Sequence, residues 1–318
     1  MVFSTNGIIT NEKNEVLLIL RRDSRTWAPA GGGLDFGELP PDGAEREVFE
    51  ETGLNVKAHQ LVGVYFWPNR GEPFLTFSFR CVIQGGDLTT SWETPQVRYF
   101  PINRLPWLLL PFHHKRVTNG IDHAARSPYW GVQHMKWYEA LGVQLIRRVW
   151  KPYRKLWFLM HRGVKFVGEY ERWVAGAFVV VRNEAGGVLW VKRTDMDFWN
   201  LPGGGGHDDE PPWETAVRET YEETGLHVNL TDLSGVYLYD DKRHVIFVFT
   251  AVIESGQLTT GSKSAAFAYF APGHEPENVF CQHVERAADA CYPRDGTVFR
   301  FQNSGTDVNE EAVQLISS

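Results

Sequence analysis

The stretch GGLDFGELPPDGAEREVFEETGL, residues 32–54, decides how the rest of the chain is interpreted. It begins with glycines, passes through two prolines and then predicts one short helix rich in carboxylates. Asp42 is expected to cap the start of this helix, because the prolines before it cannot extend a helix from upstream. Gly53 is expected to end it, because a glycine just past a helix readily adopts left-handed backbone angles.

The carboxylates of this helix share one face. Glu47, Glu50 and Glu51 stand at positions i, i+3 and i+4, which lie one helical turn apart. Three like charges so close repel one another, and a divalent cation removes that repulsion. Mg²⁺ prefers oxygen ligands and commonly completes its shell with water and substrate phosphates. A solvated acidic helix is the alternative interpretation of such a charge run.

The loop before the helix is expected to support it. Glu38 and Arg46 carry opposite charges and are predicted to pair. Gly31, Gly32 and Gly33 are expected to give the loop backbone angles that are closed to other residues.

The same stretch recurs at residues 204–226 as GGGHDDEPPWETAVRETYEETGL, with Glu219, Glu222 and Glu223 at the same offsets. Flanking segments repeat as well, since VIESGQLTT (252–260) mirrors VIQGGDLTT (82–90). The chain therefore contains a duplicated domain with a period near 170 residues. The repeated offsets favour metal binding over a merely solvated helix.

Both copies resemble the Nudix box, a pattern of spaced Gly, Glu, Arg-Glu, Glu-Glu and Gly positions. The first copy matches it at every specified position: Gly32, Glu38, Arg46, Glu47, Val48, Glu50, Glu51, Gly53 and Leu54. The second departs from it only at Thr220, where an aliphatic residue is expected. So many fixed positions make the signal far more specific than a lone glycine motif.

The resemblance implies an α/β fold: two Nudix-type α/β/α sandwich domains with mixed central sheets, here joined by a helical linker. It also implies a pyrophosphohydrolase that cleaves the diphosphate linkage of nucleoside diphosphate-X substrates, by attack of water at phosphorus. Mg²⁺ is the expected cofactor, with Mn²⁺ as an alternative. A nucleotide-binding sensor without turnover is the rival function, and one copy that hydrolyses beside one that binds is a mixed case.

The resemblance assigns candidate site residues in three groups. The metal ligands are Glu47, Glu50, Glu51, Glu219, Glu222 and Glu223; the catalytic candidates are Glu50, Glu51, Glu93, Glu222 and Glu223; the cofactor-binding candidates are Gly32, Gly33, Arg46, Gly204, Gly205 and Arg218. Arg46 and Arg218 also fit a bracing role. The general base is either a box glutamate or Glu93, and the repeat register places Lys263 opposite Glu93 in the second copy.

Composition sets further bounds. The chain of 318 residues is long enough for about two domains. Its net charge of −7 argues against a general nucleic-acid binder, and no sequence-specific nucleic-acid partner is expected. Three scattered cysteines form no disulfide framework or zinc motif. The first residues are expected to form a strand rather than a signal peptide, and a cytoplasmic location is expected.

Hydrophobic patterns predict the remaining elements. Residues 2–9 and 16–22 are expected to form a hairpin, replayed by 174–182 and 188–193. Further strands are predicted near 60–67, 74–83, 97–101 and 245–253, and a helix over 113–125.

Residues 129–172 are predicted to be a linker between domains 1–128 and 173–318. They contain nine Lys or Arg and three Glu, with apolar residues at helical spacing. A connector packed on the domains, a membrane-surface helix over 141–165 and a basic wall for an anionic substrate are the three alternatives. The oligomeric state is open, and the duplication is compatible with an internal pseudo-dimer.

Overall fold

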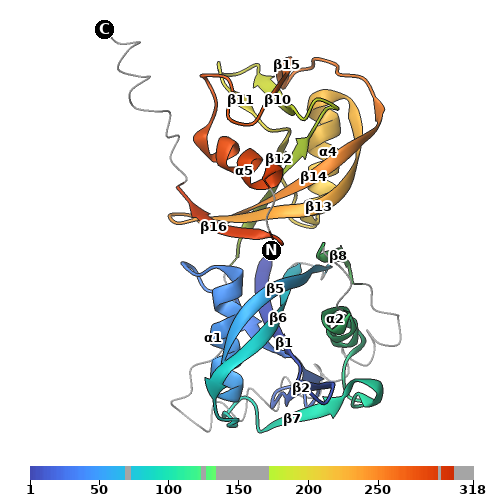
Figure 1. Cartoon of the computed structure of the whole chain (residues 1–318), viewed down its shortest axis with the longest axis vertical. Helices are drawn as coiled ribbons and strands as arrows, with labels where there is room; N and C mark the ends of the chain where they lie inside the picture. Colours follow the sequence, from blue (N-terminus) through green and yellow to red (C-terminus); the bar gives the residue numbers. More distant parts are fainter. Residues whose placement is uncertain (69–72, 123–126, 134–171, 293–294, 304–318) are drawn as a thin grey trace. The chain divides into compact units, whose positions relative to one another are not determined.

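The computed structural model describes residues 1–68, 73–122, 127–133, 172–292 and 295–303. The chain divides between Arg172 and Trp173 into two compact units, and Met1 belongs to the C-terminal one. Each unit has its own sheets, helices and hydrophobic core (Figure 1).

The N-terminal unit combines a five-stranded mixed sheet, ordered β4-β1-β6-β5-β8, with a three-stranded sheet, ordered β3-β2-β7. In the larger sheet β1 runs parallel to β6, and β5 runs parallel to β8. The strands are β1 (Val2–Ile9), β2 (Glu15–Leu20), β3 (Trp27–Ala28), β4 (Ala30–Gly33), β5 (Leu54–Trp67), β6 (Phe74–Gly86), β7 (Gln96–Pro101) and β8 (Tyr129–Val132). The helices are α1 (Pro40–Thr52), α2 (Pro111–Ile121) and a 3₁₀ turn over Ile102–Arg104.

The two helices cover opposite faces of the larger sheet. A Cβ on Gly7 would lie 2.7 Å from Val48 of α1, whereas the neighbouring Ile8 lies against Gly120 of α2. Successive residues of a strand point to opposite faces, so these two contacts place α1 and α2 on either side of β1. This layering is the sandwich that the sequence predicts.

The C-terminal unit repeats the arrangement, with a five-stranded sheet ordered β12-β9-β14-β13-β16 and a three-stranded sheet ordered β11-β10-β15. Its strands are β9 (Val174–Val181), β10 (Val188–Arg193), β11 (Trp199–Asn200), β12 (Gly203–Gly205), β13 (Leu226–Tyr239), β14 (His244–Gly256), β15 (Ser264–Phe270) and β16 (Val298–Gln302). Its helices are α4 (Pro212–Thr224) and α5 (Cys281–Cys291). The predicted fold class, two mixed α/β domains, is confirmed.

The predicted hairpins are wrong. The strands themselves exist, but β1 and β2 belong to different sheets and are joined only by a bridge between Thr10 and Val16. The two edges of β1 pair with β4 and β6 instead. In the second copy the matching bridge joins Arg182 to Val188.

The start of the box helix also differs from the prediction. Leu39 is the N-cap residue and makes no side-chain capping bond, so Asp42 lies inside the first turn. Pro40 and Pro41 occupy the first helical positions, where a missing N–H removes no intrahelical hydrogen bond. Gly53 ends the helix with a φ of 74°, as predicted.

The predicted linker begins too early. Tyr129–Val132 form β8, which pairs with β5 and has its counterpart in β16 of the second unit. Residues 134–171, including the predicted membrane-surface helix, lie outside the described residues. Within the described ranges, no helix combines the length and apolar character that crossing a membrane requires.

The left-handed angle at Gly53 generates a stability prediction. A Cβ there would meet the Asp87 carbonyl oxygen at 2.6 Å in addition to the strained φ. We expect Gly53→Ala to lower the free energy of unfolding by about 2 kcal/mol, measured by denaturant unfolding. Gly85→Ala is the control, because a Cβ at Gly85 meets nothing within 4 Å. Equal stability of the two variants would contradict the proposed strain.

Candidate active site

An arginine organises the carboxylates of each box. In the N-terminal copy the Nε and Nη2 atoms of Arg46 donate to both oxygens of Glu38, at 3.0 and 2.7 Å. Its Nη1 atom donates to Glu47 at 2.9 Å and to Glu50 at 3.4 Å. One guanidinium therefore connects the entry loop to the acidic face of α1, as the predicted Arg46–Glu38 pair anticipates.

Strand β4 supplies the surface against which two of the glutamates pack. The backbone N–H of Gly31 donates to Oε2 of Glu51 at 2.7 Å. A Cβ on Gly32 would lie 2.5 Å from the Glu47 carboxylate, and one on Gly31 would collide with the carbonyl oxygen of Thr5. Glycine is therefore required at these two positions, because neighbouring atoms lie too close to leave room for a Cβ.

The predicted reason for the glycines is wrong, because Gly31–Gly33 form an ordinary strand and none of them has a positive φ.

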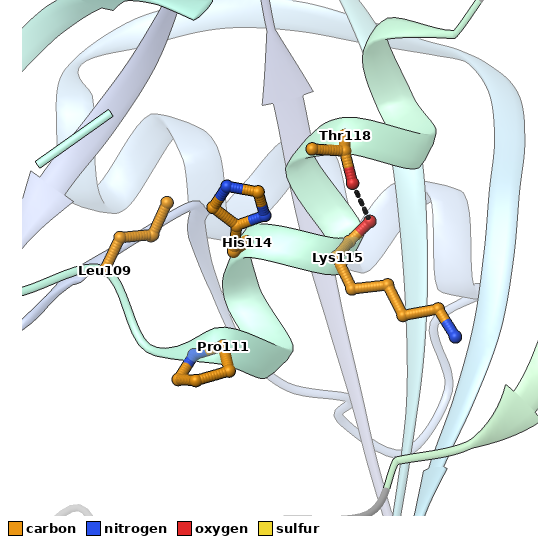
Figure 2. A pocket seen from close by; sticks show the side chains of 5 residues that line it. All are labelled: Leu109, Pro111, His114, Lys115 and Thr118. Carbon is orange, nitrogen blue, oxygen red and sulfur yellow. Dashed lines mark hydrogen bonds between the residues drawn. The ribbon is translucent and has the colours of Figure 1, made fainter. Parts of the chain in front are cut away.

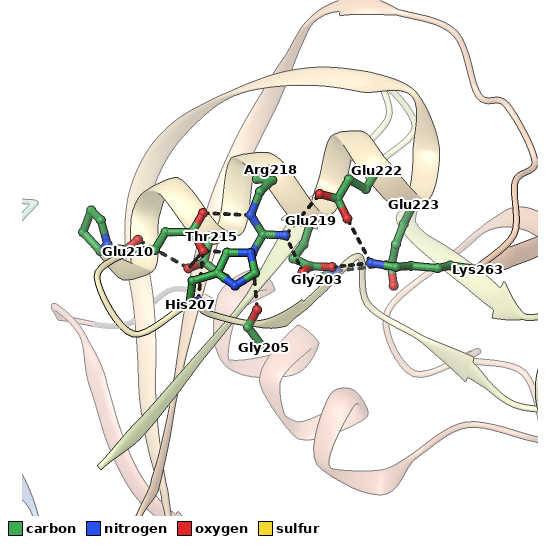
Figure 3. Close-up of polar contacts among 11 residues, drawn as sticks. Gly203, Gly205, His207, Glu210, Thr215, Arg218, Glu219, Glu222, Glu223 and Lys263 are labelled. Atoms are coloured by element: carbon green, nitrogen blue, oxygen red, sulfur yellow. Dashed lines mark hydrogen bonds and ion pairs between the residues drawn. The ribbon is translucent and has the colours of Figure 1, made fainter. Parts of the chain in front are cut away.

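The C-terminal copy reproduces the arrangement (Figure 3). Arg218 donates to both oxygens of Glu210, each at 2.8 Å, and to Glu219 at 2.6 Å and Glu222 at 3.2 Å. The N–H of Gly203 donates to Glu223 at 3.1 Å.

In this copy too a glycine lies under a glutamate. A Cβ on Gly204 would lie 2.8 Å from the Glu219 carboxylate, so the close packing seen at Gly32 recurs. The carbonyl oxygens of Gly33 and Gly205 accept from Arg46 at 3.0 Å and from Arg218 at 3.3 Å.

Burial shifts the titration of the inner carboxyls. It raises the pKa of Glu51 to about 8, and repulsion from Glu47 and Glu93 adds to the effect. Burial likewise raises the pKa of Glu47 to about 7, against the opposing pull of Arg46, and that of Glu223 to about 7. The hydrogen bonds from Arg218 lower the pKa of Glu210 to about 2. The arginine thus stabilises the charge of the loop glutamate, whereas desolvation is the larger effect at Glu47, Glu51 and Glu223.

These features fit a hard divalent cation at the N-terminal copy. Glu47 and Glu51 offer carboxylate oxygens, which Mg²⁺ prefers, and desolvation penalises the ionised forms of the buried Glu51 and of Glu47, whose side chain is 15% exposed. Among the described residues, no group of three or more His, Cys, Asp or Glu is already gathered in a form that could hold a metal. Glu50 stays further out, with its side chain 57% exposed.

The second copy differs in one respect. The Nζ atom of Lys263 lies 3.2 Å from Oε2 of Glu219 and 2.9 Å from Oε2 of Glu222. These contacts lower the pKa of Glu222 and raise that of Lys263. The repeat register indicates the position of Lys263, but it does not predict that the ammonium reaches the box.

A pocket lies elsewhere in the N-terminal unit, along α2 and the loop before it (Figure 2). It is lined by Leu109, Pro111, His114, Lys115 and Thr118. No box carboxylate belongs to its lining. The candidate catalytic Glu93 is exposed on the loop before β7, and its charge lies near enough to the box to contribute to the raised pKa of Glu51.

The NUDIX domain model matches residues 3–119 and 172–281, which together make up more than half of the chain. The chain belongs to the NUDIX family. This membership agrees with the enzyme class that both boxes imply, a Nudix pyrophosphohydrolase, and confirms the tandem resemblance.

Three proteins similar to this Nudix chain each match less than half of it. A Bacillus subtilis protein named "Putative 8-oxo-dGTP diphosphatase" is 39% identical over 42% of this chain and 83% of its own length. The ADP-ribose pyrophosphatase of Methanocaldococcus jannaschii is 32% identical over 36% of this chain and 69% of its own. The crystal structure of a Streptococcus suis ADP-ribose pyrophosphatase is 20% identical, with a TM-score of 0.36, over 40% of this chain and 98% of that one.

The raised pKa of Glu51 predicts an unusual pH dependence. The unfolded carboxyl ionises near pH 4.5, whereas the folded one holds its proton up to about pH 8. The folded state therefore binds more protons in this window, and its stability falls as the pH rises. In metal-free protein we expect Glu51→Gln to remove roughly 2 kcal/mol of the decline between about pH 5.5 and 8.

Calorimetric unfolding in the presence of a chelator measures this decline. Asp42→Asn is the control, because Asp42 is an exposed carboxylate on the same helix. A decline of equal size in wild type and Glu51→Gln would refute the assignment of the shift to Glu51.

Proposed function

We propose that the chain is a Mg²⁺-dependent hydrolase, with Mn²⁺ as an alternative cation, that cleaves the diphosphate linkage of a nucleoside diphosphate joined to another group. One observation carries the proposal. In both copies two glutamates that are largely removed from solvent pack on a glycine strand, with pKa values raised at Glu47, Glu51 and Glu223, while an arginine donates to the outer glutamate of each pair.

The glutamates would hold the cation. Glu47 and Glu51 offer oxygens from the buried side of α1, and Glu50 offers one from its exposed end, with Glu219, Glu222 and Glu223 in the matching places. When bound, the cation would neutralise charge on the phosphate oxygens and make a water easier to deprotonate. Arg46 and Arg218 act as braces, because their donors are already directed to carboxylates and to the glycine carbonyls.

The proposed reaction also needs a general base that accepts a proton from the attacking water. Phosphoryl transfer depends mainly on positioning and charge neutralisation, so the chain needs to supply one base and a fixed geometry. We assign Glu51 as the base, since its carboxylate lies in the box and the backbone N–H of Gly31 holds it in place at 2.7 Å. Glu93 is the alternative base in the N-terminal copy, because its charge acts on Glu51 from the adjacent loop.

The substrate class follows from what the relatives share. Their names refer to 8-oxo-dGTP and to ADP-ribose. Each compound contains a nucleoside diphosphate that is linked onward through its second phosphate. We therefore assign this chain a substrate with that linkage.

The three cysteines, all unpaired, agree with a reducing compartment such as the cytoplasm.

Removing one inner carboxylate from each copy tests the proposal. We expect Glu51→Gln combined with Glu223→Gln to lower kcat at least about 100-fold, since general-base catalysis alone contributes that much. Turnover of 8-oxo-dGTP and ADP-ribose would be measured with Mg²⁺ and with Mn²⁺.

Asp42→Asn combined with Glu214→Gln is the matched control, since it removes one exposed carboxylate from the first turn of each box helix. Hydrolysis in ¹⁸O-labelled water is expected to place the label in a phosphate product. Undiminished turnover in the Glu51/Glu223 double variant would exclude the assigned site.

A further inference from the structure

Glu93 and Lys263 occupy the same place in the two copies. The backbone N–H of Arg22 donates to the Glu93 carbonyl at 2.9 Å, and that of Thr194 donates to the Lys263 carbonyl at 3.3 Å. The two loops therefore present side chains of opposite charge from one backbone position.

The residue that follows confirms this equivalence. Thr94 donates its hydroxyl to the carbonyl of Glu51 at 2.7 Å, and Ser264 donates its hydroxyl to the carbonyl of Glu223 at 2.6 Å. Both loops are thus fastened to the last turn of the box helix by the same bond. This hydrogen bond fixes the position of the backbone at Glu93 and at Lys263 relative to the box glutamates.

We propose that Lys263 acts as a tethered cation that competes with the divalent cation at the C-terminal box, so that the two copies differ in metal affinity and the N-terminal copy is the tighter site. The inference rests on the proposed function, because it concerns the same cation: as the metal concentration rises, the N-terminal site would fill before the C-terminal one. The observation that carries it is the pair of contacts from Lys263 Nζ to Glu219 and Glu222.

Charge arithmetic supports this difference. Exchanging a carboxylate for an ammonium makes the C-terminal site two unit charges less negative than the N-terminal one. The ammonium also lies on the oxygens of Glu219 and Glu222, which in the N-terminal copy correspond to Glu47 and Glu50. A divalent cation at the second box must therefore either displace Lys263 or bind beside a like charge.

An incoming cation can displace the Lys263 ammonium from the two glutamates. The lysine side chain is 49% exposed, and its four-carbon stem can move the ammonium into solvent. We therefore expect weakened binding rather than none. Repulsion between a divalent ion and an ammonium about 4 Å away, screened as in water, corresponds to about a 30-fold change in Kd.

Manganese binding to the full chain without substrate tests the proposal. The free Mn²⁺ signal in electron paramagnetic resonance counts bound ions directly and needs no turnover. Glu223→Gln isolates the N-terminal site, and Glu51→Gln isolates the C-terminal site. Lys263→Met then removes the ammonium from the isolated C-terminal site, and Glu93→Lys introduces one at the isolated N-terminal site.

We expect Kd at the C-terminal site to be at least about 30-fold higher than at the N-terminal site, because Glu93 adds negative charge to the latter. Lys263→Met is expected to tighten the C-terminal site by a similar factor, and Glu93→Lys to weaken the N-terminal one. Lys192→Met is the control, because Lys192 pairs with Asp197 at 2.7 Å and not with a box glutamate. Thermal unfolding of each variant checks that the fold is retained.

Equal affinities at the two sites, or a C-terminal affinity that Lys263→Met leaves unchanged, would overturn the inference. The result is independent of the proposed reaction. Unequal metal affinities without turnover would refute the proposed hydrolase activity and support the inference about Lys263. Turnover with equal affinities would support the hydrolase activity and refute that inference.

Discussion

The constraint on which the rest depends is the burial of glutamates that the fold gathers into a small space, to which their mutual repulsion adds. Burying a carboxylate is expensive unless it is paired or hydrogen-bonded. Each copy meets this constraint in two ways: Arg46 or Arg218 binds the outer oxygens, and a backbone N–H of the glycine strand binds the innermost glutamate. The cluster is thus held in place by hydrogen bonds from the protein's own groups.

Much of this site follows from the sequence, because it is local. The spacing of Glu47, Glu50 and Glu51 predicts a shared face, and the pairing of Arg46 with Glu38 spans only eight residues. Where local rules fail, a non-local contact decides. The glycines before the helix look like a flexible loop, yet Gly31 forms a strand that pairs with Asn6 and lies against Glu51. Their lack of a side chain serves close packing, which spacing alone cannot show.

The same limit explains the other differences. Short strands separated by a turn predict a hairpin, but β1 already uses both of its edges, so β2 joins another sheet. The four residues of β8 lie far along the chain from β5, and only the assembled sheet reveals that they belong to it. Lys263 stands 41 residues from Glu222, and its contact with the box depends on how one loop lies across a helix end.

The buried frame behind the box shows where the two copies have stayed alike. In the first, the buried Arg116 donates to Gln133, and in the second Arg286 donates to Gln302. Buried arginines without a nearby partner would be destabilising, so retention of this amide contact in both copies reflects the demands of the fold. The fold does not require a particular residue type at position 263, because the side chain there is half exposed. The copies therefore differ where a change alters the charge at the site and leaves the fold intact, which is the pattern expected when duplicated domains diverge in chemistry rather than in structure.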